Sequence, residues 1–138
     1  TWVNPLDRIT AMYEKRQYYE ALRLLDERLQ KYPKNTAALL LKAKVLLAQE
    51  RFKESSQSYE AVLESAIAPS VRSKALSGLG FCRLGQAELA KRTLDLAGFK
   101  TQLDASESAF QDATNLLPSN GEAWVGLTQL YILNNLPA

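Results

Sequence analysis

The chain has 138 residues, of which 46% are hydrophobic and 23% are charged, and these values are typical of one globular domain with an ordinary core. Its 17 basic and 15 acidic residues are interspersed and leave a formal charge of +2, so no basic block could follow a phosphate backbone. Nucleic acid is therefore not an expected partner. No apolar run approaches the length of a membrane span, and the single cysteine excludes an internal disulfide.

The ends of the chain suggest that it is a piece of a longer protein. The first residue is Thr1 rather than methionine, and no signal peptide is visible. We therefore expect residues 1–138 to form a single domain within a longer chain, whose targeting signals can have been lost with the missing N-terminus. The compartment is unknown from the sequence, and the cytoplasm is the favoured expectation.

Taken in chain order, the sequence predicts helices and no strands. Pro5 suits the first turn of a helix because its missing N–H has no partner there in any case. A further proline, Pro69, opens a fifth helix that is expected to end before Gly85. The other predicted helices cover approximately residues 4–15, 18–31, 35–49, 52–66 and 121–134.

Three stretches repeat one pattern of apolar and small positions. The first has Tyr18, Ala21, Leu25 and Leu29, and thirty-four residues later the second has Phe52, Ser55, Tyr59 and Leu63. A third copy is expected thirty-five residues after the second, with Ala90, Leu94 and Ala97 in the same roles. A small residue at a helix crossing allows two backbones to approach, and the large residue four positions later fills the adjoining groove. The pattern indicates a repeated helical hairpin.

These residues resemble the tetratricopeptide repeat (TPR) family, and the segment "FQDATNLLPSNGEAWVGLTQLY" is the strongest match. Its residues Phe110, Ala113, Pro118, Trp124, Leu127 and Tyr131 have the family's spacing, whereas Thr128 replaces the family's glycine. The resemblance implies an all-α fold, a right-handed α-solenoid of antiparallel helix pairs with about three to four repeats. It also implies a non-enzymatic role in protein–protein interaction, since such arrays act as scaffolds for unrelated partners.

The repeats lose their register between residues 86 and 117. Pro33 and Pro118 are 85 residues apart, which is two and a half repeats, so one helix is expected to be lost or absorbed. Apolar residues recur every seven positions here, namely Leu89, Leu96, Leu103, Phe110 and Leu117. This seam favours one long helix across residues 86–117, and the alternative is two helices hinged near Gly98 to Thr101.

Catalytic chemistry has little support in the sequence. The absence of histidine excludes a histidine base and the common zinc ligand sets, and no cofactor is expected. Gly80 and Gly85 have the spacing of a phosphate-binding loop, but Gln86 and Ala87 stand where that loop needs lysine and a hydroxyl residue. These glycines instead suggest close helix packing and a tight turn, and Cys82 suggests a small buried residue.

The resemblance places a partner-binding groove on the first helices of successive repeats. This groove is mainly apolar with a few basic residues, which suits an amphipathic helix or an extended apolar peptide. Its predicted residues are Leu6, Thr10, Tyr13, Leu40, Lys44, Leu47, Arg72, Ala75, Leu79, Cys82, Arg83, Val125, Gln129 and Ile132. Only Arg72 suits a clamp for a chaperone's terminal carboxylate, so that ligand is disfavoured.

Two functions follow as predictions. The leading one is a non-enzymatic interaction module or scaffold that binds a protein segment in this groove. The alternative is a self-association domain that uses the long helix or the C-terminal helix. That last helix has Trp124, Leu127 and Tyr131 on one face, and the residues after Asn134 are too few to cover it. We therefore expect the parent chain to continue past Ala138.

Overall fold

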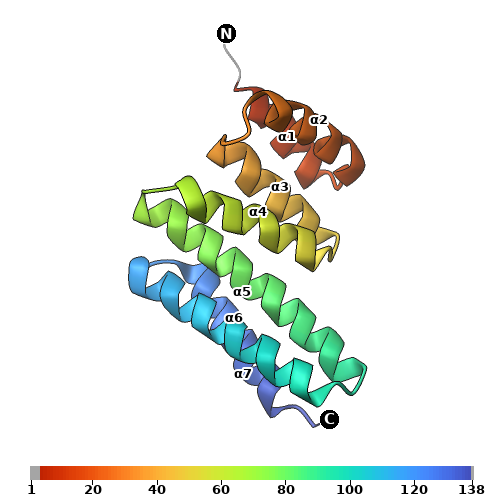
Figure 1. The fold of residues 1–138 in the computed structure, drawn as a ribbon, viewed down its shortest axis with the longest axis vertical. Coiled ribbons are helices and arrows are strands. Elements are labelled where there is room, and N and C mark those ends of the chain that lie inside the picture. The colour runs from red at the N-terminus through yellow and green to blue at the C-terminus, as the bar shows by residue number, and fades with distance from the viewer. Residues whose placement is uncertain (1–3, 138) are drawn as a thin grey trace. The chain divides into compact units, whose positions relative to one another are not determined.

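The computed structural model describes residues 4–137, and its secondary structure over that range is seven α-helices without strands (Figure 1). The all-α class predicted from the sequence is therefore confirmed. All five helices with predicted limits at both ends agree with the structure within one residue at each end. The helices are α1 (Pro5–Glu14), α2 (Tyr18–Lys31), α3 (Thr36–Ala48), α4 (Phe52–Ser65), α5 (Pro69–Arg92), α6 (Leu96–Leu116) and α7 (Gly121–Asn135).

Three helices begin at an asparagine cap. The side chain of Asn35 accepts a hydrogen bond from Ala38 N at 3.1 Å, and that of Asn120 accepts one from Ala123 N at 3.2 Å. Asn4 caps α1 in a similar way, just before Pro5. Each cap satisfies a backbone N–H that has no partner within its helix, which fixes where the helix starts.

The chain divides into two compact units, which are described separately below. The first unit, residues 1–65, consists of the hairpins α1/α2 and α3/α4, and α3 packs on both helices of the first hairpin. Ala21, Leu25, Ala38 and Val45 are fully buried in its core. The repeated small and apolar positions of the sequence therefore form the contact between successive helices.

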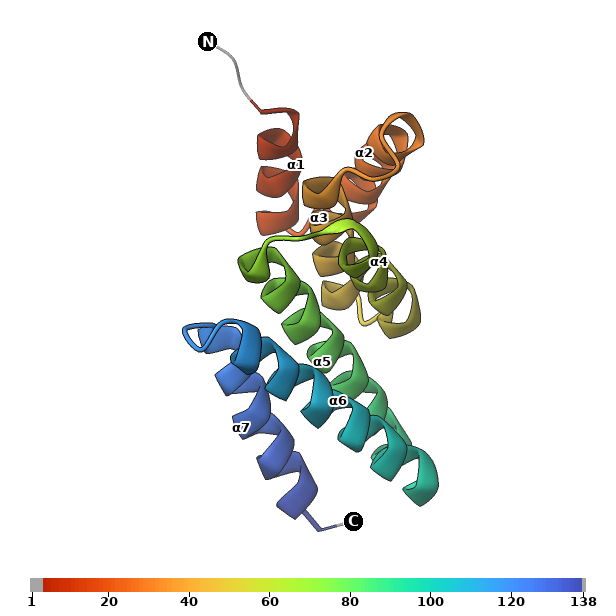
Figure 2. The ribbon, with the colours of Figure 1, turned by 60° about the vertical axis from the view of Figure 1, so that its left-hand side comes forward.

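The second unit, residues 66–138, is a long antiparallel hairpin of α5 and α6 with α7 packed alongside both helices (Figure 2). Its core contains Phe110 at the centre, and the partly buried rings of Phe81 and Phe99 pack against that core. The other buried members are Leu84, Ala87, Leu103, Ala113, Ala123, Leu127 and Leu130.

The same tight turn closes each hairpin. Arg16, Glu50 and Leu94 follow the ends of α1, α3 and α5, and all three have φ near +60°. After α5, Leu94 N donates to Lys91 O and Asp95 N donates to Ala90 O, and equivalent pairs of bonds close the other two turns. This Schellman geometry usually has glycine at the left-handed position, yet none of the three residues is glycine. The three turns mark α1/α2, α3/α4 and α5/α6 as successive repeats.

The expected path of the chain between residues 86 and 117 is wrong in both of its versions. A single helix does not span this range, and the hinge lies at Thr93–Asp95 rather than near Gly98 to Thr101. Helix α5 also continues through Gly85, where it was expected to have ended. The physical reason is the Asp95 side chain, which accepts a hydrogen bond from Gly98 N at 2.9 Å and so starts a new helix immediately after the left-handed Leu94.

The spacing of Pro33 and Pro118 exceeds two repeats by half a repeat because two helices are longer than usual, and no helix has been lost. Helices α5 and α6 have 24 and 21 residues, against 13 and 14 for α3 and α4. The third copy of the pattern is therefore not at Ala90, because Leu94 is an exposed turn residue. Its true position is Ser106, whose Oγ donates to Gly80 O at 2.7 Å, as Ser55 Oγ donates to Ala43 O at 2.7 Å. Of the apolar residues spaced seven positions apart, Leu103 and Phe110 are buried, whereas Leu89 and Leu96 are exposed.

Replacing Leu94 by glycine should stabilise the protein. The left-handed backbone costs a branched or bulky residue about 1–2 kcal/mol, and Leu94 is 74% exposed, so little burial is lost with its side chain. The greater freedom of glycine in the unfolded chain offsets about 0.5–1 kcal/mol of this gain, so we expect the melting temperature to rise by about 2–4 °C. The control is Glu88→Gly at an exposed position inside α5, which should lower the free energy of unfolding by about 1 kcal/mol. A loss of stability in both variants would show that the left-handed backbone at Leu94 does not destabilise the protein.

Candidate protein-interaction surfaces

The ring of Phe110 sets the distance between the three helices of the second unit. Phe110 is fully buried, and a Cβ atom added at either Gly80 or Gly126 would overlap its ring. The ring of Phe81 meets it edge-on, with the centroids 5.0 Å apart. The glycines of α5 and α7 are therefore the sites at which the Phe110 side chain of α6 lies against backbone. The predicted role of Gly80 in close packing is confirmed.

A polar cluster fixes the turn that leads into α7. Ser73 Oγ donates to Ala113 O at 2.7 Å, and the Asn120 amide nitrogen lies 2.9 Å from the same Oγ. Asn120 also caps α7, so one side chain joins α5 to the start of the last helix. At the surface of this turn, the Trp124 indole N–H donates to Pro118 O at 2.9 Å. This bond holds the indole ring in one orientation before any partner arrives.

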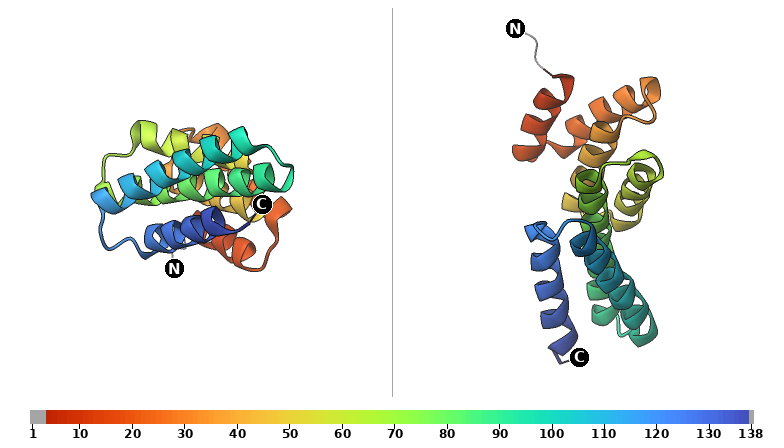
Figure 3. Two further views of the ribbon diagram at one scale, coloured as in Figure 1. Left: turned by 90° about the horizontal axis from the view of Figure 1, so that it is seen from below. Right: turned by 90° about the vertical axis from the view of Figure 1, so that its left-hand side faces the viewer.

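The other end of α7 is held by Lys91, which lies in the last turn of α5. Its Nζ donates to Leu133 O at 2.9 Å and to Leu136 O at 2.7 Å, and it lies 5.3 Å from the centre of the Phe99 ring. Leu133 O also accepts a hydrogen bond from Leu136 N at 3.3 Å. A cation at this position adds hydrogen bonds to carbonyls at the C-terminal end of α7 and interacts favourably with the helix dipole. The turn between α5 and α6 accordingly lies beside the C-terminal end of α7 (Figure 3).

The outer face of α7 is open and uncharged. Trp124 is 52% exposed, Tyr131 45% and Ile132 57%, and Val125 is equally open. By contrast, Leu127 is buried, so only two of the three residues that were predicted to share an open face are exposed. No charged side chain occurs after Glu122 in the sequence. We call Trp124, Val125, Thr128, Tyr131 and Ile132 the α7 outer face.

In the first unit, the predicted groove residues lie on α1 and α3. Lys44 is exposed, whereas Leu6 is buried in the core between the helices. The remaining four are partly buried: Thr10, Tyr13, Leu40 and Leu47. Thr10 Oγ1 donates to Leu6 O at 2.8 Å, which uses its hydroxyl hydrogen within α1.

In the second unit, the predicted groove residues lie on α5 and α7. Ala75 and Cys82 are fully buried, and the buried thiol agrees with the small apolar role that the sequence suggested for it. Leu79, Arg72 and Arg83 are partly buried on α5, and Arg72 Nη1 donates to Ala66 O at 3.0 Å. On α7 the predicted residues are all exposed, namely Val125, Gln129 and Ile132.

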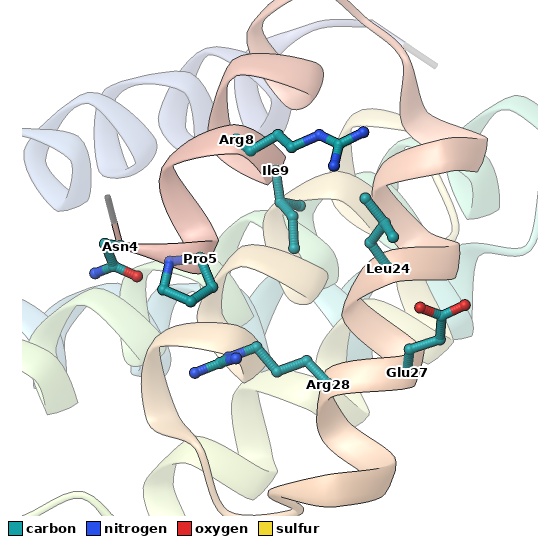
Figure 4. A pocket seen from close by; sticks show the side chains of 7 residues that line it. All are labelled: Asn4, Pro5, Arg8, Ile9, Leu24, Glu27 and Arg28. Carbon is teal, nitrogen blue, oxygen red and sulfur yellow. The ribbon is translucent and has the colours of Figure 1, made fainter. Parts of the chain in front are cut away.

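A hollow of about 510 Å³ lies between α1 and α2 in the first unit (Figure 4). Arg8 and Arg28 lie on either side of an apolar floor of Ile9 and Leu24. The other lining residues are Asn4, Pro5 and Glu27. Arg28 has a buried Nε atom without a hydrogen-bond partner, and its guanidinium group lies 5.2 Å from the Tyr32 ring centre. Sequence reasoning missed this hollow because its residues are divided between two helices and form no motif.

Charged groups elsewhere form surface pairs. Arg51 donates to both carboxylate oxygens of Glu54, at 3.0 and 2.7 Å, and these hydrogen bonds lower the pKa of Glu54. Glu20, with Glu27, raises the pKa of Arg23 in the same way on α2. Exposed pairs of this kind contribute little to stability. They lie in the first turns of helices or along helix surfaces of the first unit.

Within residues 4–137, no group of three acidic or cysteine side chains is placed to hold a metal ion. None of the described helices is both long enough and apolar enough to cross a lipid bilayer.

Comparison with known proteins confirms the resemblance on which the repeat prediction depended. Residues 12–72 match the Tetratricopeptide repeat family. The solved structure described as "MamA RS-1 ArsTM double mutant" superposes with a TM-score of 0.64 at 21% sequence identity, over 94% of this chain and 73% of that one. A search of curated proteins finds no match. The structural likeness agrees with an all-α helical-repeat solenoid fold.

Substituting Gly126 by alanine should test the close approach at Phe110. The added methyl group would overlap the Phe110 ring, and overpacking a core typically costs about 1–3 kcal/mol, against a gain of about 1 kcal/mol in helix propensity. We expect a lower melting temperature. Gly121→Ala is the matched control, since nothing lies within 4 Å of a Cβ atom at that position of the same helix. Equal effects of the two substitutions would contradict the role assigned to Phe110.

Replacing Lys91 by methionine should loosen the end of α7. The variant keeps the length of the side chain and removes the charge and both hydrogen bonds to α7, which together stabilise it by about 1–2 kcal/mol. Amide hydrogen exchange should increase in the last turn of α7. The same substitution at the exposed Lys100 on α6 should leave that exchange unchanged. Unaltered exchange in the Lys91 variant would show that the two carbonyls are not held by this side chain.

Proposed function

We propose that this protein is a non-enzymatic interaction module that binds a helical or extended segment of a partner protein on the open surfaces of its first helices. The observation that carries this proposal is the exposure of large, uncharged side chains on α7, where Val125 and Ile132 belong to the predicted groove. An exposed apolar patch of this kind typically marks a contact surface. The general role of the family in protein interaction supports the same conclusion.

The groove in the first unit fits the proposal in composition. Lys44 is exposed between the partly buried Leu40 and Leu47, so an apolar side chain of a ligand could lie beside an acidic one. On α5, Leu79 and Arg83 repeat this combination of an apolar and a basic residue. The favoured ligand class is an apolar peptide that carries a few carboxylates.

A second candidate is self-association through α7. The observation in its favour is that the α7 outer face has no charged residue, so a symmetric contact would bring no like charges together. The route through a long helix over residues 86–117 is no longer available, because the chain turns back at Thr93–Asp95. Sedimentation at several concentrations should separate the two candidates, since a groove binder stays monomeric without its ligand.

The groove is tested with peptides selected on this chain from a random display library. The double variant Lys44→Glu/Leu79→Glu should lose binding of the selected peptides, because two carboxylates would face their apolar and acidic groups. The control is Tyr19→Glu on α2, at a position that is highly exposed and outside the groove. Helical circular dichroism and melting temperature should be nearly unchanged in both variants. Binding that survives the double variant with an intact fold would refute the groove as the ligand site.

A further inference from the structure

The hollow between α1 and α2 contains two arginines that no carboxylate neutralises. Arg8 comes from α1 and Arg28 from α2, on either side of the apolar floor (Figure 4). Within residues 4–137, no ion pair joins either guanidinium group to an acidic side chain. Glu27 also lines the hollow, but its carboxylate is paired with Arg23 at 3.1 Å. The hollow therefore has two positive charges that need a partner.

Arg28 is held in position by its surroundings. Its guanidinium carbon lies 5.2 Å from the ring centre of Tyr32, and its Nε atom is buried without a hydrogen-bond partner in the described part of the chain. A buried donor without a partner is costly, and a bound ion is one recognised reason for such an atom. Helix packing does not require an arginine here, because Val62, thirty-four residues later in the repeat, is fully buried at the corresponding position.

The surface between the two arginines is apolar. Ile9 is buried, Leu24 is partly buried, and Pro5 lies beside them, so the floor offers no side-chain hydrogen bond. Figure 4 shows Ile9 between the guanidinium groups of Arg8 and Arg28. The volume of about 510 Å³ lies within the usual range of small-molecule sites, roughly 300–1,000 Å³. The hollow thus combines a positive charge on each side with an apolar centre.

We propose that this hollow binds a small aliphatic dicarboxylate, in which an apolar linker joins two carboxylate groups. One carboxylate accepts charge-assisted hydrogen bonds from Arg8 and the other accepts them from Arg28, since the planar fork of an arginine matches a carboxylate. The linker covers Ile9 and Leu24 and removes apolar surface from water. This site is separate from the groove of the proposed function, and neither depends on the other.

A small molecule suits this hollow better than a polypeptide segment, whether of this chain or of another. Where second helices pack on first helices in this chain, the residue at the crossing is small: Ala21, Ser55 and Ser106. A helix laid over the hollow would instead meet two arginines and bury their charges. An extended peptide would bring main-chain N–H and C=O groups against Ile9 and Leu24, which have no partners for them. A hydrocarbon linker has neither cost.

The experiment titrates suberate into the full chain and follows the amide and arginine Nε–H signals by NMR. We expect saturable shifts that are largest in α1 and α2, together with a shift of the Arg28 Nε–H signal. Octanoate has the same chain length and only one carboxylate. It should bind at least about tenfold more weakly, because it leaves one arginine without a partner. Equal affinities for suberate and octanoate, or no saturable binding of suberate, would overturn the inference.

The variants Arg8→Gln and Arg28→Gln should each weaken suberate binding by at least about tenfold. The matched control is Arg92→Gln, at an exposed arginine of α5 outside the hollow, and it should bind suberate as the parent chain does. Arg8 is exposed, so the Arg8→Gln variant should keep its helical circular dichroism and melting temperature. Suberate binding that is unchanged in this folded variant would refute the site.

A further titration tests the choice of a small molecule over a polypeptide. The probe is a capped tetrapeptide in which two leucines separate two glutamates. We expect it to bind more weakly than suberate, because its main chain loses hydration over the apolar floor. Tighter binding of the tetrapeptide than of suberate, lost in the Arg8→Gln variant, would assign the hollow to a polypeptide and overturn the inference. The peptides from the display selection test the groove independently of these results.

Discussion

The second unit depends on the contact between one phenylalanine and two glycines. Phe110 of α6 lies against the backbones of α5 and α7 at Gly80 and Gly126, and neither position has space for a Cβ atom. Because protein interiors are close-packed, a ring held between two backbones determines the separation of both helices from α6. The buried Ser106 contact with Gly80 O adds a directional bond to this packing. The orientation of α7, and with it the direction of its outer face, follows from these contacts.

The extra length of α5 and α6 has a consequence for α7. In a repeat of ordinary length α5 would end well before Lys91, and the carbonyls of Leu133 and Leu136 would lack their lysine partner. The lengthened hairpin therefore supports α7 from the Asn120 cap to its final turn. A helix held at both ends presents its exposed apolar side chains in fixed positions, which reduces the conformational cost of binding.

Local sequence signals predicted most of the helices, because caps, prolines and the 34-residue pattern act within a few residues of one another. The path after Gly85 could not be predicted in this way. Leu89, Leu96 and Leu103 are spaced seven residues apart, which predicts an uninterrupted helix. The turn that separates α5 from α6 depends instead on the Asp95 cap and on a left-handed backbone at Leu94, a conformation that leucine rarely adopts. The hollow between α1 and α2 was also beyond sequence reasoning, since it depends on how two helices pack.

The α7 outer face was accessible to sequence reasoning only in part. Spacing put Trp124, Leu127 and Tyr131 on one side of a helix, but a spacing rule cannot tell which part of that side the preceding repeat covers. In the structure Leu127 packs into the core, and the exposed arc is centred on Thr128.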